Sequence, residues 1–237
     1  MRRFFGTIFA TATMLFICTP SAELVAKPKK YDPLVFGLGK PALPTGEVAF
    51  INGINHKPDR ALKCSSLLSS MAGGYNVYTV YNPTDGLLED LRQCFFELVN
   101  YKTSAPVFKL HEKWDEFFRS CKRDDEFFLQ FCHSQGAIQV RNALMLYPPE
   151  LRERIVVVAI APGAYITQNL CGKVFHYVSR RDIVPLFDRR GKRLAKDTII
   201  RLNPHRKARF FDHHFLSPTY RTAIDHHLKQ YVKINYQ

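Results

Sequence analysis

The chain has 237 residues, of which 46% are hydrophobic and 23% charged, a composition that excludes an intrinsically disordered protein and allows one domain with a substantial core. Its formal net charge of +13 favours acidic partners such as anionic lipid headgroups, acidic glycans or nucleic acid. No nucleic-acid motif and no interleaving of aromatic with basic residues accompanies this charge, so nucleic acid is not the expected partner.

Residues 1–26 have the pattern of a signal peptide. Arg2 and Arg3 form a basic start, and the apolar run from Phe4 to Cys18 is shorter than a membrane-spanning helix. Small residues follow at 19–22 and supply a cleavage site, with an uncleaved N-terminal anchor as the alternative. We therefore expect an exported protein that is periplasmic, secreted or associated with the envelope.

Residues 27–45 contain four prolines and little periodicity, which predicts an extended leader ahead of a domain at 46–237. Strands and helices alternate within that domain. Short apolar or β-rich runs predict strands at 47–52, 75–81, 127–131, 155–160, 174–178 and 198–202. Helical spacing and capping residues predict helices at 58–72, 85–102, 106–121 and 135–147, and a last one from Ser217 to about Val232. This order predicts an α/β fold with a doubly wound, mostly parallel sheet and helices on both faces.

The strand predicted at 127–131 leads directly into Cys-His-Ser-Gln-Gly at 132–136, and a helix follows. This is the G-x-S-x-G pattern of a nucleophile elbow, with Cys132 in place of the first glycine. In such a turn the serine hydroxyl projects above the end of the sheet, and the N–H groups that open the helix point at a developing oxyanion. Ser134 is therefore the candidate nucleophile. His133 matches the common variant with histidine before the serine and is not the expected base.

A serine nucleophile needs a base, and the base needs an orienting acid. In this type of fold the acid comes between the serine and the histidine along the chain. Asp182 follows the strand predicted at 174–178, at the edge of the sheet where the elbow lies. Asp188 is the second candidate, and an ordinary turn aspartate paired with Arg180 or Arg181 is the non-catalytic alternative.

Two adjacent histidines, His213 and His214, follow the last predicted strand. Either can reach Ser134, and we favour His213 as the base. The neighbouring Asp212 is expected to tune this histidine or to anchor the loop. His226 and His227 fall within the last predicted helix and are expected on the surface.

The oxyanion requires two backbone donors. One is the N–H of Gln135, the residue after the nucleophile. The other is expected from Ile54 or Asn55, in the loop after the first predicted strand, where Gly53 permits a close approach of the backbone.

These motifs together resemble the α/β-hydrolase superfamily. The similarity rests on Phe-Ile-Asn-Gly-Ile-Asn at 50–55, Cys-His-Ser-Gln-Gly at 132–136, Asp-Ile-Val-Pro at 182–185 and Asp-His-His-Phe-Leu-Ser-Pro at 212–218, and it covers about 46–235. It implies a lipase- or esterase-like hydrolase with a serine nucleophile. The chain also resembles an uncharacterised family of predicted hydrolases from obligate intracellular bacteria, which implies no substrate.

Two positions depart from the superfamily pattern. Asn52 stands where a histidine commonly precedes the glycine, which leaves the main-chain donor intact. Cys132 occupies a tight position that prefers glycine, and it is either tolerated or a sign that catalysis has been lost.

The sequence predicts neither a metal site nor a cofactor, because it has no C-x-x-C pair and no zinc-type spacing of cysteine and histidine. Removal of 1–26 leaves five cysteines, so at least one stays free, and Cys132 is the expected one.

The favoured interpretation is an exported serine hydrolase that cleaves an ester, a thioester or a lipid acyl bond. Only about a dozen residues separate the strands at 155–160 and 174–178, so we expect a minimal lid, with the helix at 106–121 or the basic loop at 186–197 overhanging the site. Between Lys173 and Arg209 there are twelve Lys or Arg against three Asp, which predicts either an ordinary solvated loop of a basic protein or contact with an anionic membrane or glycan surface. The alternative is a catalytically silent binding protein that uses the basic segment 180–209.

Overall fold

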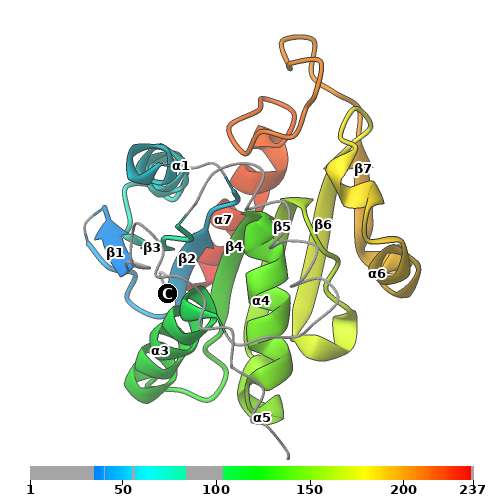
Figure 1. The fold of residues 1–237 in the computed structure, drawn as a ribbon. Coiled ribbons are helices and arrows are strands. Elements are labelled where there is room, and N and C mark those ends of the chain that lie inside the picture. The colour runs from blue at the N-terminus through cyan, green and yellow to red at the C-terminus, as the bar shows by residue number, and fades with distance from the viewer. Residues whose placement is uncertain (1–34, 40, 55–56, 84–103, 236–237) are drawn as a thin grey trace, which may run out of the picture.

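The computed structural model describes residues 35–39, 41–54, 57–83 and 104–235 (Figure 1). These residues form a seven-stranded sheet in the order β1-β3-β2-β4-β5-β6-β7. Its strands are β1 (Val35–Leu38), β2 (Glu47–Ile51), β3 (Val77–Val80), β4 (Phe128–Ser134), β5 (Ile155–Pro162), β6 (Lys173–Ser179) and β7 (Ile199–Leu202). Only β1 runs antiparallel to its neighbour, while the remaining pairs are parallel. The prediction of a mostly parallel sheet is confirmed.

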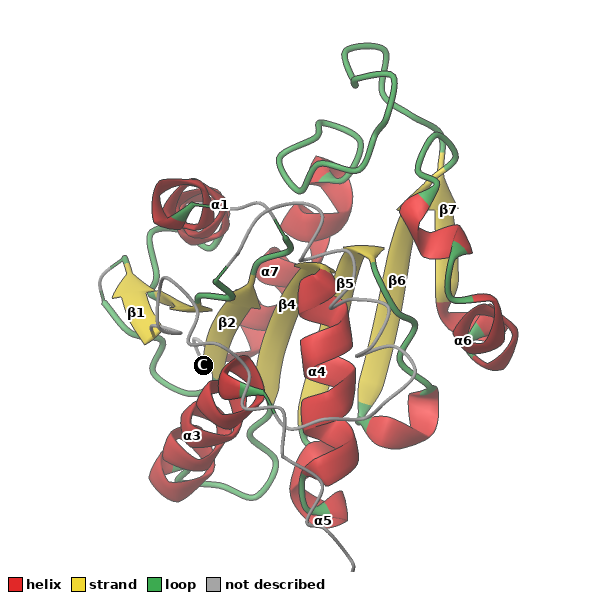
Figure 2. Cartoon of the chain, viewed as in Figure 1, coloured by secondary structure: helices red, strands yellow, loops and turns green. Residues whose placement is uncertain are grey.

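Helices cover both faces of this sheet (Figure 2). The described helices are α1 (Pro58–Met71), α3 (Ala105–Ser120), α4 (Gln135–Leu146), α5 (Pro149–Arg152), α6 (Arg189–Leu194) and α7 (Arg221–Asn235). Helices α3 and α4 pack on one face, and α1 and α7 on the other. The sheet is therefore doubly wound.

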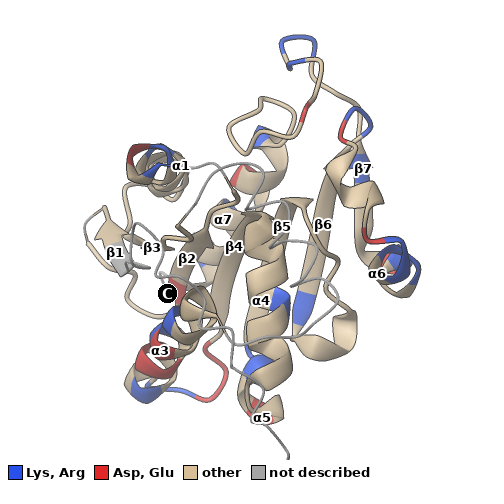
Figure 3. Cartoon of the chain, viewed as in Figure 1, with Lys and Arg blue, Asp and Glu red and all other residues tan. Residues whose placement is uncertain are grey.

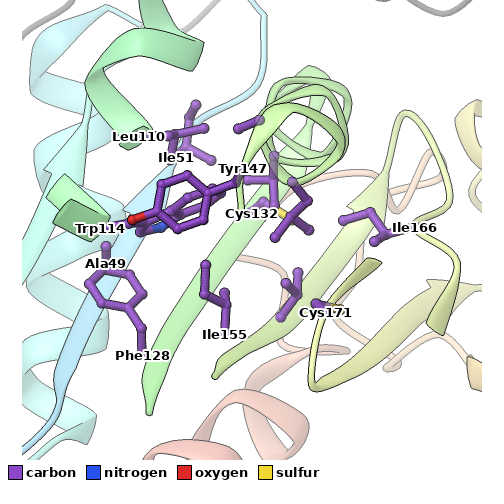
Figure 4. Packing of buried hydrophobic residues seen from close by; sticks show 14 of the residues in the cluster. Ala49, Ile51, Leu110, Trp114, Phe128, Cys132, Tyr147, Ile155, Ile166 and Cys171 are labelled. Atoms are coloured by element: carbon purple, nitrogen blue, oxygen red, sulfur yellow. The ribbon is translucent and has the colours of Figure 1, made fainter. Parts of the chain in front are cut away.

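The central strands are apolar throughout because each buries both of its faces. In β2, Ala49 and Ile51 face α3 and α4, whereas Val48 and Phe50 face α1 and α7. Figure 4 shows the first of these cores, where Trp114 packs beside Tyr147 and Phe128. Each large side chain removed completely from water in this way stabilises the fold by about 2 kcal/mol.

Three sequence predictions require correction or extension. The predicted leader contributes β1, a strand that sequence analysis missed. The last helix begins at Arg221 and not at Ser217, because Ser217 opens a turn in which its carbonyl accepts from the N–H of Tyr220. His227 is buried against Tyr177, with 2.8 Å between its Nε2 and the tyrosine hydroxyl, although we expected it on the surface; His226 is exposed as predicted.

The structure also describes the two segments expected to overhang the site. Helix α3 packs flat on the sheet and contributes Leu110 and Trp114 to the core. The basic segment 186–197 contains α6, which lies beside β7 at the edge of the sheet (Figure 1). The connection between β5 and β6 is short, as predicted, and holds only the single 3-10 turn η1 (Gln168–Leu170).

The predicted signal peptide and the helix predicted at 85–102 lie outside the described residues. None of the helices in the described ranges combines the length and apolarity needed to span a bilayer.

Candidate active site

Ser134 sits in a strained turn between β4 and α4. Its φ of 53° and ψ of −124° place it in a region that residues with a side chain rarely adopt, at a cost of roughly 1–3 kcal/mol. The parallel pairing of β4 with β5 also shifts register between His133 and Ser134. This is the geometry of a nucleophile elbow, in which the serine leaves the sheet and caps the following helix.

Three glycines make the strained turn possible by letting other segments approach it. A Cβ atom on Gly53 would lie 2.5 Å from Cβ of Ser134, and one on Gly163 would lie 2.8 Å from the Ser134 carbonyl oxygen. A Cβ atom on Gly136 would lie 2.7 Å from the carbonyl oxygen of Ile51. The N–H of Gly163 also donates to the Ser134 carbonyl at 2.8 Å. The role of Gly163 was missed from the sequence, where Pro162-Gly163 at the end of a strand was the only signal.

Cys132 does not crowd this turn. Its side chain is fully buried in the core beneath α4 (Figure 4). Burial raises the pKa of its thiol far above the usual range, so the group packs as a small neutral side chain. Each cysteine among the described residues, namely Cys64, Cys121, Cys132 and Cys171, is free.

The structure brings Ser134, His213 and Asp182 into one hydrogen-bonded chain. Nε2 of His213 lies 2.9 Å from Oγ of Ser134, and Nδ1 lies 2.8 Å and 3.0 Å from the two carboxylate oxygens of Asp182. The Asp182 side chain is almost completely buried, and it also accepts from the N–H of Val184 at 3.0 Å. A carboxylate at Nδ1 favours the tautomer with its proton there, which leaves Nε2 free to accept from the serine hydroxyl.

His214 occupies a different environment although it is the next residue. Its Nε2 contacts the guanidinium of Arg60. Burial, together with the positive charges of Arg60 and Arg209, lowers the pKa of His214 to about 4. Of the two histidines that the sequence left open, His213 is the one bonded to Ser134.

The loop that carries His213 is held by Asp212. The Asp212 carboxylate accepts from three hydroxyls, those of Ser179 at 2.7 Å, Ser217 at 2.5 Å and Thr219 at 2.5 Å. Its carbonyl accepts from the Tyr220 hydroxyl at 2.9 Å. Of the two roles considered for Asp212, the structure therefore supports the anchoring of the loop.

Two further predicted residues have structural partners. His133 lies 2.7 Å through Nε2 from the carbonyl oxygen of His213 and ties the elbow to the histidine loop. Asp188, the second candidate acid, caps α6 by accepting from the N–H of Gly191 at 2.8 Å and also accepts from the N–H of Tyr165 at 2.9 Å. The carboxylate that meets His213 is that of Asp182.

The residues expected to supply the oxyanion donors lie beside the elbow. Gln135 is the first residue of α4, so its N–H lies in the first turn of that helix. Ile54 follows Gly53, which abuts Ser134. Asn55 lies outside the described residues.

A network of buried amides joins these two segments. Nδ2 of Asn52 donates to the carbonyls of Gly53 at 2.9 Å and Asn82 at 2.8 Å, and Oδ1 of Asn52 accepts from the Asn82 N–H at 2.9 Å. Nδ2 of Asn82 then donates to Oε1 of Gln135 at 2.8 Å. Sequence analysis missed Asn82; the signal was an asparagine within two residues of the end of each of two neighbouring parallel strands. Asn52 thus holds the loop through its side-chain amide.

No cluster of His, Cys, Asp and Glu suited to a metal ion occurs in the part of the chain that the structure describes. The arrangement around Ser134 can perform nucleophilic chemistry with protein groups alone.

The fold and the geometry around Ser134 define a chain with the α/β-hydrolase fold. Residues 39–236 match the family described as Protein of unknown function (DUF687), and the chain belongs to that family. None of the curated proteins matches the sequence.

Similar solved structures are esterases and hydrolases of low sequence identity. An arylesterase is 11% identical with a TM-score of 0.54, covering 88% of this chain and 87% of that chain. An S-formylglutathione hydrolase from Agrobacterium tumefaciens is 14% identical with a TM-score of 0.52, covering 85% of this chain and 94% of the other. A monoacylglycerol lipase from Paleococcus ferrophilus is 12% identical with a TM-score of 0.52, covering 86% and 99%. At these identities the likeness establishes the fold.

Proposed function

We propose that the protein is an exported serine hydrolase that cleaves an ester, a thioester or a lipid acyl bond. One observation carries the proposal: the hydrogen-bonded chain from Ser134 through His213 to the buried Asp182, on a serine held in a strained elbow. A strained backbone and a buried carboxylate both lower the stability of the fold, and both occur preferentially at catalytic sites.

The reaction follows from the positions of these groups. Oγ of Ser134 attacks the acyl carbon while Nε2 of His213 takes the hydroxyl proton, and Asp182 stabilises the imidazolium. The N–H groups of Gln135 and Ile54 receive the oxyanion. The imidazolium returns its proton to the leaving alcohol or thiol, and water then releases the acyl group from Ser134 by the same steps in reverse.

The rim of the site supports contact with a lipid surface. Five exposed apolar side chains lie in the loops that carry Asp182 and His213: Ile183, Leu186, Phe187, Phe210 and Phe211. Phe210 is 81% exposed and Phe187 is 70% exposed. Lysines and arginines also lie within both loops (Figure 3). Apolar and cationic side chains in this combination suit an anionic membrane. An acidic glycan would contact the cationic side chains alone.

Labelling by a fluorophosphonate tests the catalytic proposal directly. We expect the wild-type protein and the Ser66→Ala control, which alters an exposed serine of α1, to label at the same rate. Ser134→Ala should not label. Wild-type protein that fails to react, or Ser134→Ala protein that reacts equally, would contradict the proposal and leave binding through the basic segment 180–209 as the alternative.

A panel of p-nitrophenyl esters of graded chain length then reports on the acyl group.

Co-sedimentation with anionic vesicles tests the surface contact, with Phe210→Ser as the variant that should bind less. Equal sedimentation of variant and wild type would argue against membrane contact at this loop.

A further inference from the structure

A cationic cavity of about 680 Å³ lies beside the histidine loop. Its walls come from the start of α1 and from the segment 207–218 that precedes α7. Five of the lining side chains are cations, against the two carboxylates of Asp59 and Asp212: Lys57, Arg60, Lys63, Lys207 and Arg209. Figure 3 shows cations on both walls, at α1 and on the long loop that follows β7.

Among the described residues, the positive charge of this cavity is balanced only in part, by the carboxylate of Asp59. Within the described ranges, none of the five cations forms an ion pair. The Asp212 carboxylate is already engaged by three hydroxyls. Arg60 meets His214, and the lowered pKa of His214 keeps that ring neutral at pH 7. Like charges held around one cavity repel, and a bound anion relieves the repulsion.

The cavity and the candidate active site share the loop that carries His213 and His214. His214 lines the cavity and directly follows His213, whose ring bonds to Ser134. Lys57, on the opposite wall, comes three residues after Ile54. The lining does not include Ser134, His213 or Asp182, so a molecule with its anionic group in the cavity meets Ser134 only if it extends past His214.

We propose that this cavity binds the phosphate or carboxylate of an anionic ester, and so selects the substrate that Ser134 attacks. Arg60 and Arg209 supply planar guanidinium groups, which recognise both anions by paired hydrogen bonds. The lysines add charge at the rim. This inference rests on the proposed hydrolase function and narrows its substrate class.

Matched ester pairs test the selection. Mono-p-nitrophenyl glutarate and p-nitrophenyl valerate differ chiefly in a terminal carboxylate, and oleoyl lysophosphatidate and monoolein differ in a phosphate. We expect kcat/KM to be higher for the anionic member of at least one pair. Preference in the first pair identifies a soluble anionic ester, and preference confined to the second identifies a lipid headgroup.

The double variant Arg60→Gln, Arg209→Gln should lower the anionic-to-neutral ratio of kcat/KM by about tenfold or more, since each charge-assisted contact contributes on that order. The effect should appear mainly in KM. The control Arg190→Gln, Arg193→Gln removes the same charge from exposed positions of α6 and should leave the ratio unchanged. If the ratio fell equally in both double variants, the effect would be one of net charge, and the proposed anion site would be wrong.

Binding of inorganic phosphate to Ser134→Ala protein gives a second measurement that needs no activity. Phosphate should raise the pKa of His214, followed by NMR of the imidazole near pH 5, because an anion beside the ring favours its charged form. The shift should be lost in the Arg60→Gln, Arg209→Gln background. An active enzyme without anionic preference or a phosphate response overturns this inference alone. Phosphate binding by a protein that hydrolyses no ester supports the site and rejects the hydrolase proposal.

Discussion

His213 and His214 are adjacent in sequence, yet their surroundings give them opposite properties. His213 lies between the Asp182 carboxylate and the Ser134 hydroxyl, an arrangement that would stabilise the proton gained in the proposed reaction. His214 faces Arg60, and desolvation and nearby cations lower its pKa to about 4. A histidine with so low a pKa resists protonation, so His214 is poorly suited to take the proton of a serine hydroxyl.

Separate substitutions of the two histidines therefore have different consequences. His213→Gln should lower kcat/KM for a reactive ester by about 10³-fold or more and abolish fluorophosphonate labelling. His214→Gln should keep labelling within about tenfold of wild type, because Ser134 retains its base. The exposed His226→Gln serves as a control for surface substitution. If kcat/KM fell further in His214→Gln than in His213→Gln, the base would be His214 and the assignment of His213 would be wrong.

Cys132 offers a test of how the elbow tolerates a side chain at a position that usually holds glycine. The thiol is buried in the core under α4, so Cys132→Ala should lower the free energy of unfolding by about 1 kcal/mol. Cys132→Gly should cost about 1 kcal/mol more, because glycine gains backbone freedom in the unfolded chain. Urea denaturation measures both values.

Fluorophosphonate labelling of these two variants should proceed at the wild-type rate. Slower labelling of a stable Cys132→Ala protein would mean that the thiol shapes the turn, contrary to its placement in the core.

The loop between β7 and α7 is positioned by buried polar contacts as well as by the apolar packing of Phe215. Asp212 gathers hydroxyls from β6 and from the turn at 217–220, while His133 holds the His213 carbonyl. These contacts fix the backbone on both sides of the histidine ring. The alignment of the ring with Ser134 therefore depends on groups that do not touch a substrate.

Asp212→Asn should accordingly impair both stability and turnover. The amide nitrogen cannot accept, so buried hydroxyls lose partners at a cost of about 3 kcal/mol, and kcat should fall by about tenfold or more as His213 loses its alignment. Asp188→Asn is a matched control, since that buried aspartate caps α6 away from His213. It should lower stability with less effect on kcat. Similar kcat values for the two variants would show that Asp212 does not position the histidine.

The elements best predicted from sequence are those whose own side chains decide their structure. The continuous apolar run of β5 is buried on both faces, and Gly73 and Gly74, both at positive φ, follow α1 as its pattern indicated. Strand β1 was missed because a short edge strand depends on pairing with β3. The start of α7 was misplaced because the Ser217 hydroxyl donates to Asp212 in place of capping a helix.

For the site, chain order was enough to select Ser134, Asp182 and a histidine pair, because in a parallel sheet successive loops meet at one edge. The preference for His213 is supported by the bond of its Nε2 to Oγ of Ser134 and by the contact of His214 with Arg60, and both join residues far apart in sequence. The bonds from Asn52 to Asn82 and from Asn82 to Gln135 likewise join separate loops. Such pairings depend on the register of the sheet, which local sequence patterns do not encode.

This protein has a high positive net charge, and it keeps two buried histidines, His176 and His227, in the neutral form. The net charge of +13 makes every added proton costly. His176 is buried with both ring nitrogens engaged: Nε2 accepts from the Ile166 N–H at 3.0 Å, and Nδ1 lies 2.9 Å from the Thr198 hydroxyl. Burial lowers the pKa of His176 to about 3. Burial and His226 lower the pKa of His227 to about 4.

These two histidines should make the folded state sensitive to mild acid. Their pKa values are lower in the folded protein than the ordinary 6.5, so below about pH 6.5 the unfolded chain binds protons that the folded chain excludes. Their contribution to stability is complete above pH 6.5 and is lost as the pH falls toward 4 and 3. Between about pH 7 and pH 5, each should reduce the free energy of unfolding by about 2 kcal/mol.

Urea denaturation across that pH range measures the loss, and His176→Asn separates the contribution of one residue. Asparagine does not titrate, so the variant should lose about 2 kcal/mol less than wild type between about pH 7 and pH 5, whatever its stability at neutral pH. Ser66→Ala, a substitution of an exposed group that does not titrate in this range, should keep the wild-type dependence. A His176→Asn protein with an unchanged pH dependence would mean that the ring is protonated in the folded state, which its acceptance of the Ile166 N–H forbids.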